Sequence, residues 1–320
     1  MSLRNRFYDA GWLASHRVGA TVISIGNLTL GGTGKTPCVE YVARFCQRQG
    51  LRVAILSRGY NARNGANDEA LLLANNLAGV PHLQGKDRLA CARQAIATYN
   101  SDVLILDDGF QHRRLARDLD VVLVDATQPW GFGHLFPRGY LREPLPNLKR
   151  ADFVLLTRSD HVSRGECERL CRQIAYFAPG TPIALTTHRP IELLNAAGRK
   201  EAIGLLRGQL ALGFCGIGNP EAFRQTLEML GVRLVDFRTF SDHHRYDQRD
   251  IDDLRDWSKR QPECVCVVTT EKDLVKLPLN RLHDKPLWAL RIGLHFEKGK
   301  QEFEEALLRT ARGHSHRRAG

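Results

Sequence analysis

Two observations predict an α/β fold with a parallel sheet flanked by helices. Apolar runs rich in Val, Ile and Leu recur without polar alternation, which is typical of strands buried on both faces. They are ATVISI (20–25), RVAILS (52–57), DVLILD (102–107), DVVLVD (120–125), DFVLLT (152–157) and TPIALT (181–186). Helical patterns over 37–49, 86–99 and 163–177 separate several of these runs, and strands that alternate with helices indicate a parallel sheet.

The last third of the chain predicts a second, smaller α/β domain. Strands are expected at 210–215, 232–237 and 264–269, with helices over 219–230 and 248–260. We therefore expect a core domain over 1–186, a less regular linker over 187–209 and the smaller domain over 210–320. A strand over 288–296 could pair with 187–195 as a two-stranded hinge, and the last helix, 297–312, could pack on either domain.

Composition narrows the classes of protein. The 320 residues are 43% hydrophobic, yet no run approaches the 18 uncharged apolar residues of a membrane span, and no signal peptide is recognisable. Eight cysteines without a C-x-x-C pair indicate free thiols in a reducing compartment rather than a zinc site. The net charge of +11 is compatible with nucleic acid, an acidic membrane face or a phosphorylated substrate.

The stretch IGNLTLGGTGKTP (25–37) predicts a phosphate-binding loop, or P-loop. It departs from G-x-x-x-x-G-K-[ST] only at Thr29, where the first glycine is usual. A strand precedes it and a helix opened by Pro37 follows, so glycine amides and the helix N-terminus would surround phosphate. The predicted nucleotide-binding residues are Thr29, Leu30, Gly31, Gly32, Thr33, Gly34, Lys35 and Thr36. Lys35 would reach the β- and γ-phosphates, and the Thr36 hydroxyl would bind Mg²⁺.

A second element supports a P-loop NTPase-like fold. VLILDDG (103–109) is a buried strand that ends in Asp107 and Asp108. In such folds an aspartate at the end of a neighbouring strand holds Mg²⁺, directly or through water. The sequence leaves open which of the two would touch the metal, and a plain Asp-Gly turn is the alternative interpretation.

The motifs together resemble the tetraacyldisaccharide 4′-kinase family. The resemblance runs through GNLTLGGTGKTP, ILSRGY (55–60), DDGFQHRRLARD (107–118), FPRGYLREPL (136–145) and ADFVLLTR (151–158). It continues in GNPEAF (218–223), TFSDHHRYD (239–247) and VTTEKDLVKL (268–277). Members of this family also carry Thr at the position of Thr29. The resemblance implies transfer of the γ-phosphate of ATP, with Mg²⁺, to the 4′-hydroxyl of a tetraacylated glucosamine disaccharide 1-phosphate, giving lipid IVA. It also implies a peripheral enzyme at the cytoplasmic face of the inner membrane.

The resemblance further implies a catalytic base, Asp68, in NGANDEALL. This stretch departs from the G-D-E-P-like pattern of the family at Asn67 and Ala70, and a helix N-terminal charge pair with Glu69 is the alternative. His243 is implied as the partner of Asp68 from a smaller domain that closes over the nucleotide site. The alternative there is a surface loop in which His243 and His244 are both solvated.

Other site residues follow from the same resemblance. Arg142 is implied in catalysis with Lys35, and Glu143 as a metal ligand with Thr36, Asp107 and Asp108. The planar guanidinium of one arginine can bind two oxygens of a phosphate at once. Arg88, Arg113 and, more weakly, Arg58 are therefore candidates for binding phosphate, together with His112. Lys272 and Asp273, in TTEKD, could contribute to the nucleotide end or to domain closure.

The membrane contact and two other functions remain open. Leu3, Phe7, Tyr8 and Trp12 can share one side of a helix that lies among lipid headgroups, beside Arg4 and Arg6, or one that packs its aromatic rings in the core. A nucleotide-regulated switch on nucleic acid would need an N-K-x-D motif or a nucleic-acid module, and neither is present, so no nucleic-acid partner is expected. A scaffold without catalysis conflicts with Lys35, Thr36 and the two aspartates. Acyl-chain preference and oligomeric state are not determined by the sequence.

Overall fold

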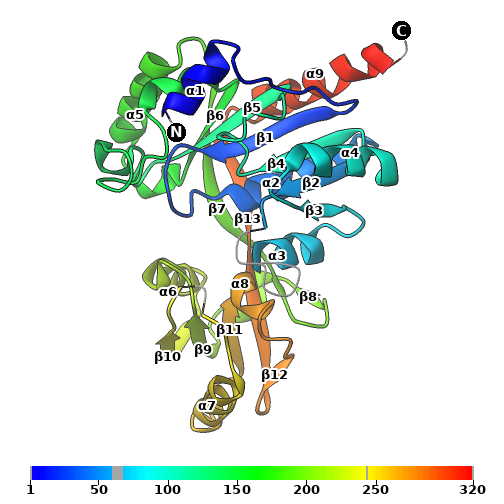
Figure 1. Ribbon diagram of the computed structural model, residues 1–320. Coiled ribbons are helices and arrows are strands. Elements are labelled where there is room, and N and C mark those ends of the chain that lie inside the picture. Colours follow the sequence, from blue (N-terminus) through cyan, green and yellow to red (C-terminus); the bar gives the residue numbers. More distant parts are fainter. Residues whose placement is uncertain (1, 60–67, 243, 319–320) are drawn as a thin grey trace. The chain divides into compact units, whose positions relative to one another are not determined.

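The apolar runs of the first half of the chain form one parallel sheet in the computed structural model, which describes residues 2–59, 68–242 and 244–318 (Figure 1). The chain divides into two compact units, unit 1 (1–188 and 294–320) and unit 2 (189–293). The elements of unit 1 are α1 (Ser2–Asp9), β1 (Thr21–Asn27), α2 (Lys35–Arg48), β2 (Val53–Ser57), α3 (Asp68–Asn76), β3 (His82–Gln84), α4 (Arg88–Tyr99), β4 (Val103–Asp107), β5 (Leu119–Asp125), β6 (Phe153–Thr157), α5 (Arg164–Phe177) and α9 (Lys300–Arg318). The α/β prediction is confirmed.

The sheet of unit 1 has the strand order β7-β6-β5-β1-β4-β2-β3, where β7 is Ile183–Leu194, and its paired strands are parallel. Side chains along β1 alternate between two cores. Ile23 and Ile25 pack in the core that α2, α3 and α9 cover, whereas Val22 packs in the core that α4 covers. Helix α5 covers the second face further along, over β5 and β6. Both faces of the sheet are therefore buried, which explains the continuous apolar runs.

The carboxyl-terminal residues 294–320 belong to unit 1, which is one of the two placements expected for the last helix, so the smaller unit ends at 293 and not at 320. Phe303 and Leu307 of α9 are fully buried in the core with Ile23 and Phe153, and the Tyr41 hydroxyl donates to Glu304 at 2.7 Å. The physical reason is that one apolar side of α9 completes the core over the central strands. An amphipathic pattern shows that a helix packs, but it does not show on which sheet.

Unit 2 contains β9 (Leu210–Cys215), α6 (Pro220–Met229), β10 (Arg233–Thr239), α7 (Gln248–Lys259), β11 (Cys266–Thr270), α8 (Glu271–Leu274), β12 (Arg281–Leu282) and β8 (Lys200–Glu201). Its parallel strands have the order β10-β9-β11-β13, where β13 is Lys285–Lys298. The chain passes between the units within β7 and returns within β13, and these two strands are neighbours in the sheet order. The expected linker over 187–209 therefore begins inside a strand, because β7 continues to Leu194.

Short elements without an apolar run were not predicted. They include β3, α3 and α8, together with the short 3-10 helices η1 (Gly131–Gly133), η2 (Leu145–Arg150), η3 (Ser159–His161) and η4 (Ile203–Leu206). All eight cysteines are free, and only Cys171 is not fully buried. Within the described ranges, no helix has the length and apolar character that crossing a membrane requires.

Candidate active site

The P-loop lies between the end of β1 at Asn27 and the start of α2 at Lys35. Gly31 and Gly34 have φ angles of 109° and 86°, a left-handed conformation that L side chains rarely adopt. The helix begins two residues before Pro37, so Lys35 and Thr36 lie in its first turn. Unpaired amides of that turn point outward and carry the partial positive charge that binds phosphate. The loop therefore has the backbone that a nucleotide phosphate needs.

Side chains from neighbouring strand ends hold this loop, and the sequence analysis did not identify them. The Asn27 amide donates to Thr33 Oγ1 at 2.9 Å, and the Thr157 hydroxyl donates to the Thr33 carbonyl at 3.0 Å. Arg158 donates to the Gly32 carbonyl at 2.9 Å and also pairs with Asp125. The available signal was their position, since each lies at or just after the carboxyl end of a predicted strand.

His188, in β7, packs directly against Gly34. A Cβ at Gly34 would clash with Cε1 and Nε2 of this imidazole. Burial, followed by the positive charge of Arg158, lowers the pKa of His188 to about 4, so the ring is neutral at pH 7. A glycine at position 34 is thus required both by its φ angle and by the neighbouring ring.

Gly34→Ala is expected to lower the free energy of unfolding of the ligand-free protein by about 1–3 kcal/mol, because the new methyl group meets His188 at a left-handed φ. Gly32→Ala is the matched control, since a Cβ there meets no atom within 4 Å. Urea unfolding of both variants measures the difference. Equal stability of the two variants would contradict this account of the loop.

Two adjacent carboxylates, Asp107 and Asp108, lie at the carboxyl end of β4. This strand pairs with β1, which leads into the P-loop. Lys35 Nζ is 3.5 Å from Asp108 Oδ1, and Arg142 Nη1 donates to both Asp108 oxygens at 2.8 and 2.7 Å. Burial raises the pKa of Asp108, but the charges of Lys35 and Arg142 outweigh it and leave the pKa below its usual value. Asp107 differs, since burial raises its pKa to about 7 against the opposing charge of Lys35. The predicted pair thus comprises one ionised carboxylate and one that is costly to ionise.

Asp107→Asn is expected to stabilise the ligand-free protein at pH 8. The raised pKa means that ionising Asp107 costs free energy in the folded state. This cost is absent below the pH range in which an ordinary aspartate ionises, and it reaches its full value above about pH 7. Rising pH therefore destabilises the folded protein through Asp107. We expect the variant to unfold about 2 °C higher or more at pH 8, with little change at pH 4.

Asp108→Asn is the control for this prediction. The pKa of Asp108 is lowered, so its ionised carboxylate stabilises the folded state at any pH above that at which an ordinary aspartate ionises. This stabilisation is lost as the pH falls and the carboxylate is protonated. The amide variant should therefore unfold at a lower temperature at pH 8. Thermal scans at both pH values measure the two shifts, and shifts of the same sign would show that the assignment of charge is wrong.

Arg88 and His112 lie beside these carboxylates. The Arg88 guanidinium is buried and 3.5 Å from His112 Nδ1, and burial lowers the pKa of Arg88 against the charges of Asp108 and Asp107. Burial and the charge of Arg88 lower the pKa of His112 to about 4. Its Nε2 is buried without a hydrogen-bond partner among the described residues. Arg58 lies near enough for its charge to lower the pKa of Arg88 as well.

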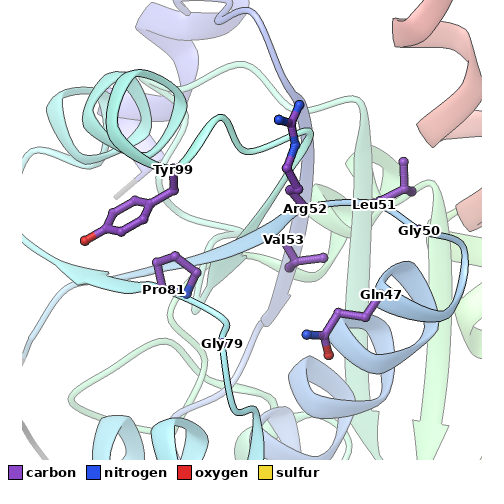
Figure 2. A pocket seen from close by; sticks show the side chains of 8 residues that line it. All are labelled: Gln47, Gly50, Leu51, Arg52, Val53, Gly79, Pro81 and Tyr99. Atoms are coloured by element: carbon purple, nitrogen blue, oxygen red, sulfur yellow. The ribbon is translucent and has the colours of Figure 1, made fainter.

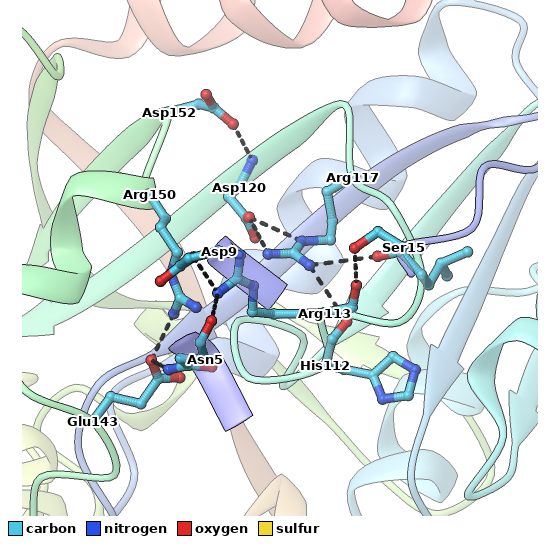
Figure 3. A network of polar contacts seen from close by, with 11 residues as sticks. Asn5, Asp9, Ser15, His112, Arg113, Arg117, Asp120, Glu143, Arg150 and Asp152 are labelled. Carbon is cyan, nitrogen blue, oxygen red and sulfur yellow. Dashed lines mark hydrogen bonds and ion pairs between the residues drawn. The ribbon is translucent and has the colours of Figure 1, made fainter. Parts of the chain in front are cut away.

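Glu143 and Arg113 form ion pairs with other residues of unit 1 (Figure 3). The Glu143 carboxylate is fully buried, and its Oε2 accepts from Asn5 at 2.5 Å and from Asn147 and Arg150 at 2.7 Å. It forms a buried ion pair with Arg150, while its Oε1 is buried without a hydrogen-bond partner among the described residues, and its role as a metal ligand stays a prediction. Arg113 pairs with Asp9 at 2.7 Å and lies 5.1 Å from the Tyr8 ring, so it contacts α1, and its contact with phosphate stays a prediction. Spacing in the sequence could not show this, because α1 supplies both sets of contacts.

Mg²⁺ fits the residues at the carboxyl edge of the sheet only together with phosphate. Within the described ranges, no group of three His, Cys, Asp or Glu side chains could hold a metal ion alone. Thr36, Asp107 and Asp108 offer a hydroxyl and two carboxylates, and phosphate oxygens would supply further ligands. A cation would also relieve the cost of an ionised Asp107 beside Asp108.

Comparisons with known proteins agree with this geometry. A family model described as tetraacyldisaccharide-1-P 4′-kinase matches residues 1–312. The chain belongs to the tetraacyldisaccharide 4′-kinase family. A member from Syntrophus aciditrophicus is 43% identical over 96% of this chain and 88% of its own, and one from Anaeromyxobacter sp. (strain Fw109-5) is 41% identical over 95% and 86%. A crystal structure titled as the "apo" form of LpxK from Aquifex aeolicus in complex with ATP has a TM-score of 0.78 and 30% identity, covering 97% of this chain and 94% of that one.

The two catalytic residues implied by the family resemblance remain predictions. Asp68 is the first residue of α3, where its backbone opens the helix. His243 lies outside the described residues. Its neighbour His244 is described, and Nε2 of this ring is 2.9 Å from Asp250 within unit 2.

Asp273 is a structural residue of unit 2. It is fully buried and accepts from the Gly216 amide at 3.1 Å, from the Tyr246 hydroxyl at 3.0 Å and from the Thr270 hydroxyl at 2.6 Å. The neighbouring Lys272 makes none of these contacts. These contacts tie loops of unit 2 together, and a contribution of Lys272 and Asp273 to the nucleotide end or to domain closure stays a prediction.

A separate hollow of about 420 Å³ lies at the opposite edge of the sheet from the P-loop. Figure 2 shows its lining, which includes Gln47 at the end of α2, Arg52 before β2 and Tyr99 at the end of α4. The Arg52 guanidinium pairs with both oxygens of Asp102, at 2.9 and 2.8 Å. Its charge is therefore compensated by the Asp102 carboxylate.

Proposed function

We propose that the protein transfers the γ-phosphate of ATP to the 4′-hydroxyl of a tetraacylated glucosamine disaccharide 1-phosphate, giving lipid IVA in lipid A biosynthesis. The observation that carries the proposal is the cluster of Lys35, Asp108 and Arg142 at the P-loop of a chain that belongs to this family throughout its length. Phosphoryl transfer needs positioning and neutralisation of charge more than covalent chemistry, and this cluster supplies both.

Each residue of the cluster has a role in this reaction. The amides of Gly31, Gly32 and Gly34 and the Lys35 ammonium would bind the phosphates, while Thr36 and the two aspartates would hold Mg²⁺. Bound Mg²⁺ supplies charge neutralisation on the phosphate oxygens. Arg142 keeps Asp108 ionised and oriented, and Arg88 is a buried cation beside the same carboxylates.

The acceptor hydroxyl needs a base, because an alcohol is a weak nucleophile. We assign this role to Asp68, which opens α3, and assign to His243 the orientation of the Asp68 carboxylate. A histidine hydrogen-bonded to a carboxylate can fix its geometry and tune its basicity. Glu69, the neighbour of Asp68, is near enough for its charge to raise the pKa of Asp107, which supports placing this helix start beside the metal residues.

The substrate is a lipid, so the enzyme would work at a membrane surface, at the cytoplasmic face of the inner membrane. Helix α1 and the turn after it support this proposal, since Leu3 in the helix is 63% exposed and Trp12 after it is 76% exposed, with the ring centroids of Phe7 and Trp12 5.3 Å apart. The aromatic rings are therefore not all in the core. Asn5, on the other side of α1, is buried against Glu143, which anchors the helix to unit 1. Arg4 and Arg6 are exposed and would be attracted to anionic lipid, by about 1 kcal/mol each.

The proposal is tested with γ-labelled ATP, Mg²⁺ and tetraacyldisaccharide 1-phosphate in detergent micelles. We expect label in the lipid, at the 4′ position of the product. ATP hydrolysis by folded protein without labelled lipid would exclude the lipid-kinase function. Omission of Mg²⁺ with chelator is the control and should abolish transfer.

A further inference from the structure

A second apolar surface lies far from α1 in the sequence. The segment 131–140, here called the aromatic loop, exposes Phe132 to 65% and Phe136 to 66%, and Leu135 and Tyr140 are exposed as well. On most protein surfaces exposed apolar residues are scattered singly. Several of them on one short segment therefore indicate an interaction surface. None of these side chains has a role in the site described above.

The aromatic loop is a built structure. Its backbone closes on itself, with the Tyr140 amide donating to the Gly131 carbonyl at 2.8 Å and the Leu141 amide donating to the His134 carbonyl at 3.0 Å. Phe132 has φ of 64°, a conformation that a bulky residue adopts only where its surroundings impose it. The Phe132 ring rests edge-on against Tyr140, with centroids 5.2 Å apart. The fold therefore fixes two rings in solvent, although burying them would release free energy.

The charge of this segment fits an anionic partner. No acidic residue occurs between Asp125 and Glu143, whereas Arg138 and His134 lie among the exposed apolar side chains. Aromatic rings beside basic groups are typical of the interface between bilayer and water, where rings reach the acyl boundary and cations meet anionic headgroups.

The base of the loop is bound to the P-loop. The Leu30 amide donates to the Tyr140 carbonyl at 2.7 Å, and the Arg142 amide donates to the Leu28 carbonyl at 2.7 Å. The next residue, Glu143, is the anchor of α1 through Asn5. The aromatic loop and α1 are thus bound to two consecutive residues, Arg142 and Glu143. Arg142 also binds Asp108. A bilayer that meets the loop would lie at a defined place relative to the phosphates.

We propose that the aromatic loop inserts into an anionic bilayer and is a second membrane contact, separate from α1, that positions the P-loop over the lipid substrate. This inference rests on the proposed function, because a lipid acceptor is what makes a fixed distance to the bilayer useful. Phe132 and Phe136 supply the apolar contact, and Arg138 supplies the contact with anionic headgroups.

The test is sedimentation of the full chain with vesicles of phosphatidylcholine, with and without phosphatidylglycerol. Wild type should bind the anionic vesicles, and Phe132→Ser/Phe136→Ser should bind them at least about tenfold more weakly, since each ring loses its apolar contact. The matched control is Tyr99→Ser/Met229→Ser, which removes two exposed large apolar side chains elsewhere and should bind like wild type. Arg138→Gln should weaken binding only where phosphatidylglycerol is present.

Three outcomes would overturn the inference. The first is equal vesicle binding by wild type and the loop variant, which would leave α1 as sufficient. The second is an equal loss of vesicle binding in Phe132→Ser/Phe136→Ser and in the control Tyr99→Ser/Met229→Ser, which would show that the loop has no special role. The third is a wild-type dimer in sedimentation velocity that the loop variant dissociates, which would identify the loop as a contact between copies. Failure of the proposed function is separate, since it would appear as absent label transfer by wild type in micelles.

Discussion

Asp68→Ala is expected to lower kcat for lipid phosphorylation by about 10²–10⁴-fold, while the KM for ATP stays near the wild-type value. A general base acts on the acceptor hydroxyl as its bond to phosphorus forms, so its loss affects the chemical step and not the binding of nucleotide. Phosphate binding depends on the P-loop and Lys35, which the substitution leaves in place. Initial rates with labelled ATP, measured across both substrate concentrations, give the two constants.

The neighbouring carboxylate provides the control. Glu69→Ala removes a charge from the same turn of α3 and is expected to retain transfer, because Glu69 acts on the site only through its field at Asp107. Equal loss in both variants would indicate that the helix start matters as a structure and not Asp68 as a base. Full transfer by Asp68→Ala would remove this residue from catalysis but leave the kinase assignment intact.

Lys35→Ala is expected to lower kcat/KM by about 10³-fold or more, through both nucleotide binding and transfer. The ammonium lies in the first turn of α2, 3.5 Å from Asp108, with only 17% of its side chain exposed. A phosphate oxygen at this partly enclosed place would lose the neutralising charge of the Lys35 ammonium. Loss of Lys35 also removes a charge that opposes the raised pKa of Asp107, so this carboxylate would become harder to ionise.

Two further variants make the result specific. Lys86→Ala removes an exposed lysine outside the P-loop and should behave like wild type in both constants. Lys35→Arg keeps the charge but not the compact ammonium, and we expect it to recover little activity, since a planar guanidinium is bulkier. Calorimetric titration with ATP separates the binding loss from the catalytic loss, and unaltered ATP affinity in Lys35→Ala would contradict the assignment of Lys35 to the phosphates.

Local patterns explain why much of the site was predictable. β1, the glycines of the P-loop and the start of α2 occupy one continuous stretch, so their spacing alone defines a phosphate site. Asp107 and Asp108 follow a buried strand, and parallel strands end at one edge of a sheet. The carboxylates and the P-loop therefore had to meet there. Arg142 required the family resemblance, because its contact with Asp108 spans 34 positions of the chain.

Local patterns in the sequence predict the α/β class, most strands of both units, the P-loop and the two carboxylates beside it, because backbone conformation and burial on both faces leave such patterns. The sequence does not show that Glu143 pairs with Arg150, that Arg113 contacts α1 or that α9 completes the core of unit 1, and these contacts follow from packing. Packing also decides that His188 and Arg158 support the P-loop. The physical reason is that a charged or apolar side chain has many compatible partners in a sequence. Packing brings only one set within hydrogen-bonding or van der Waals distance.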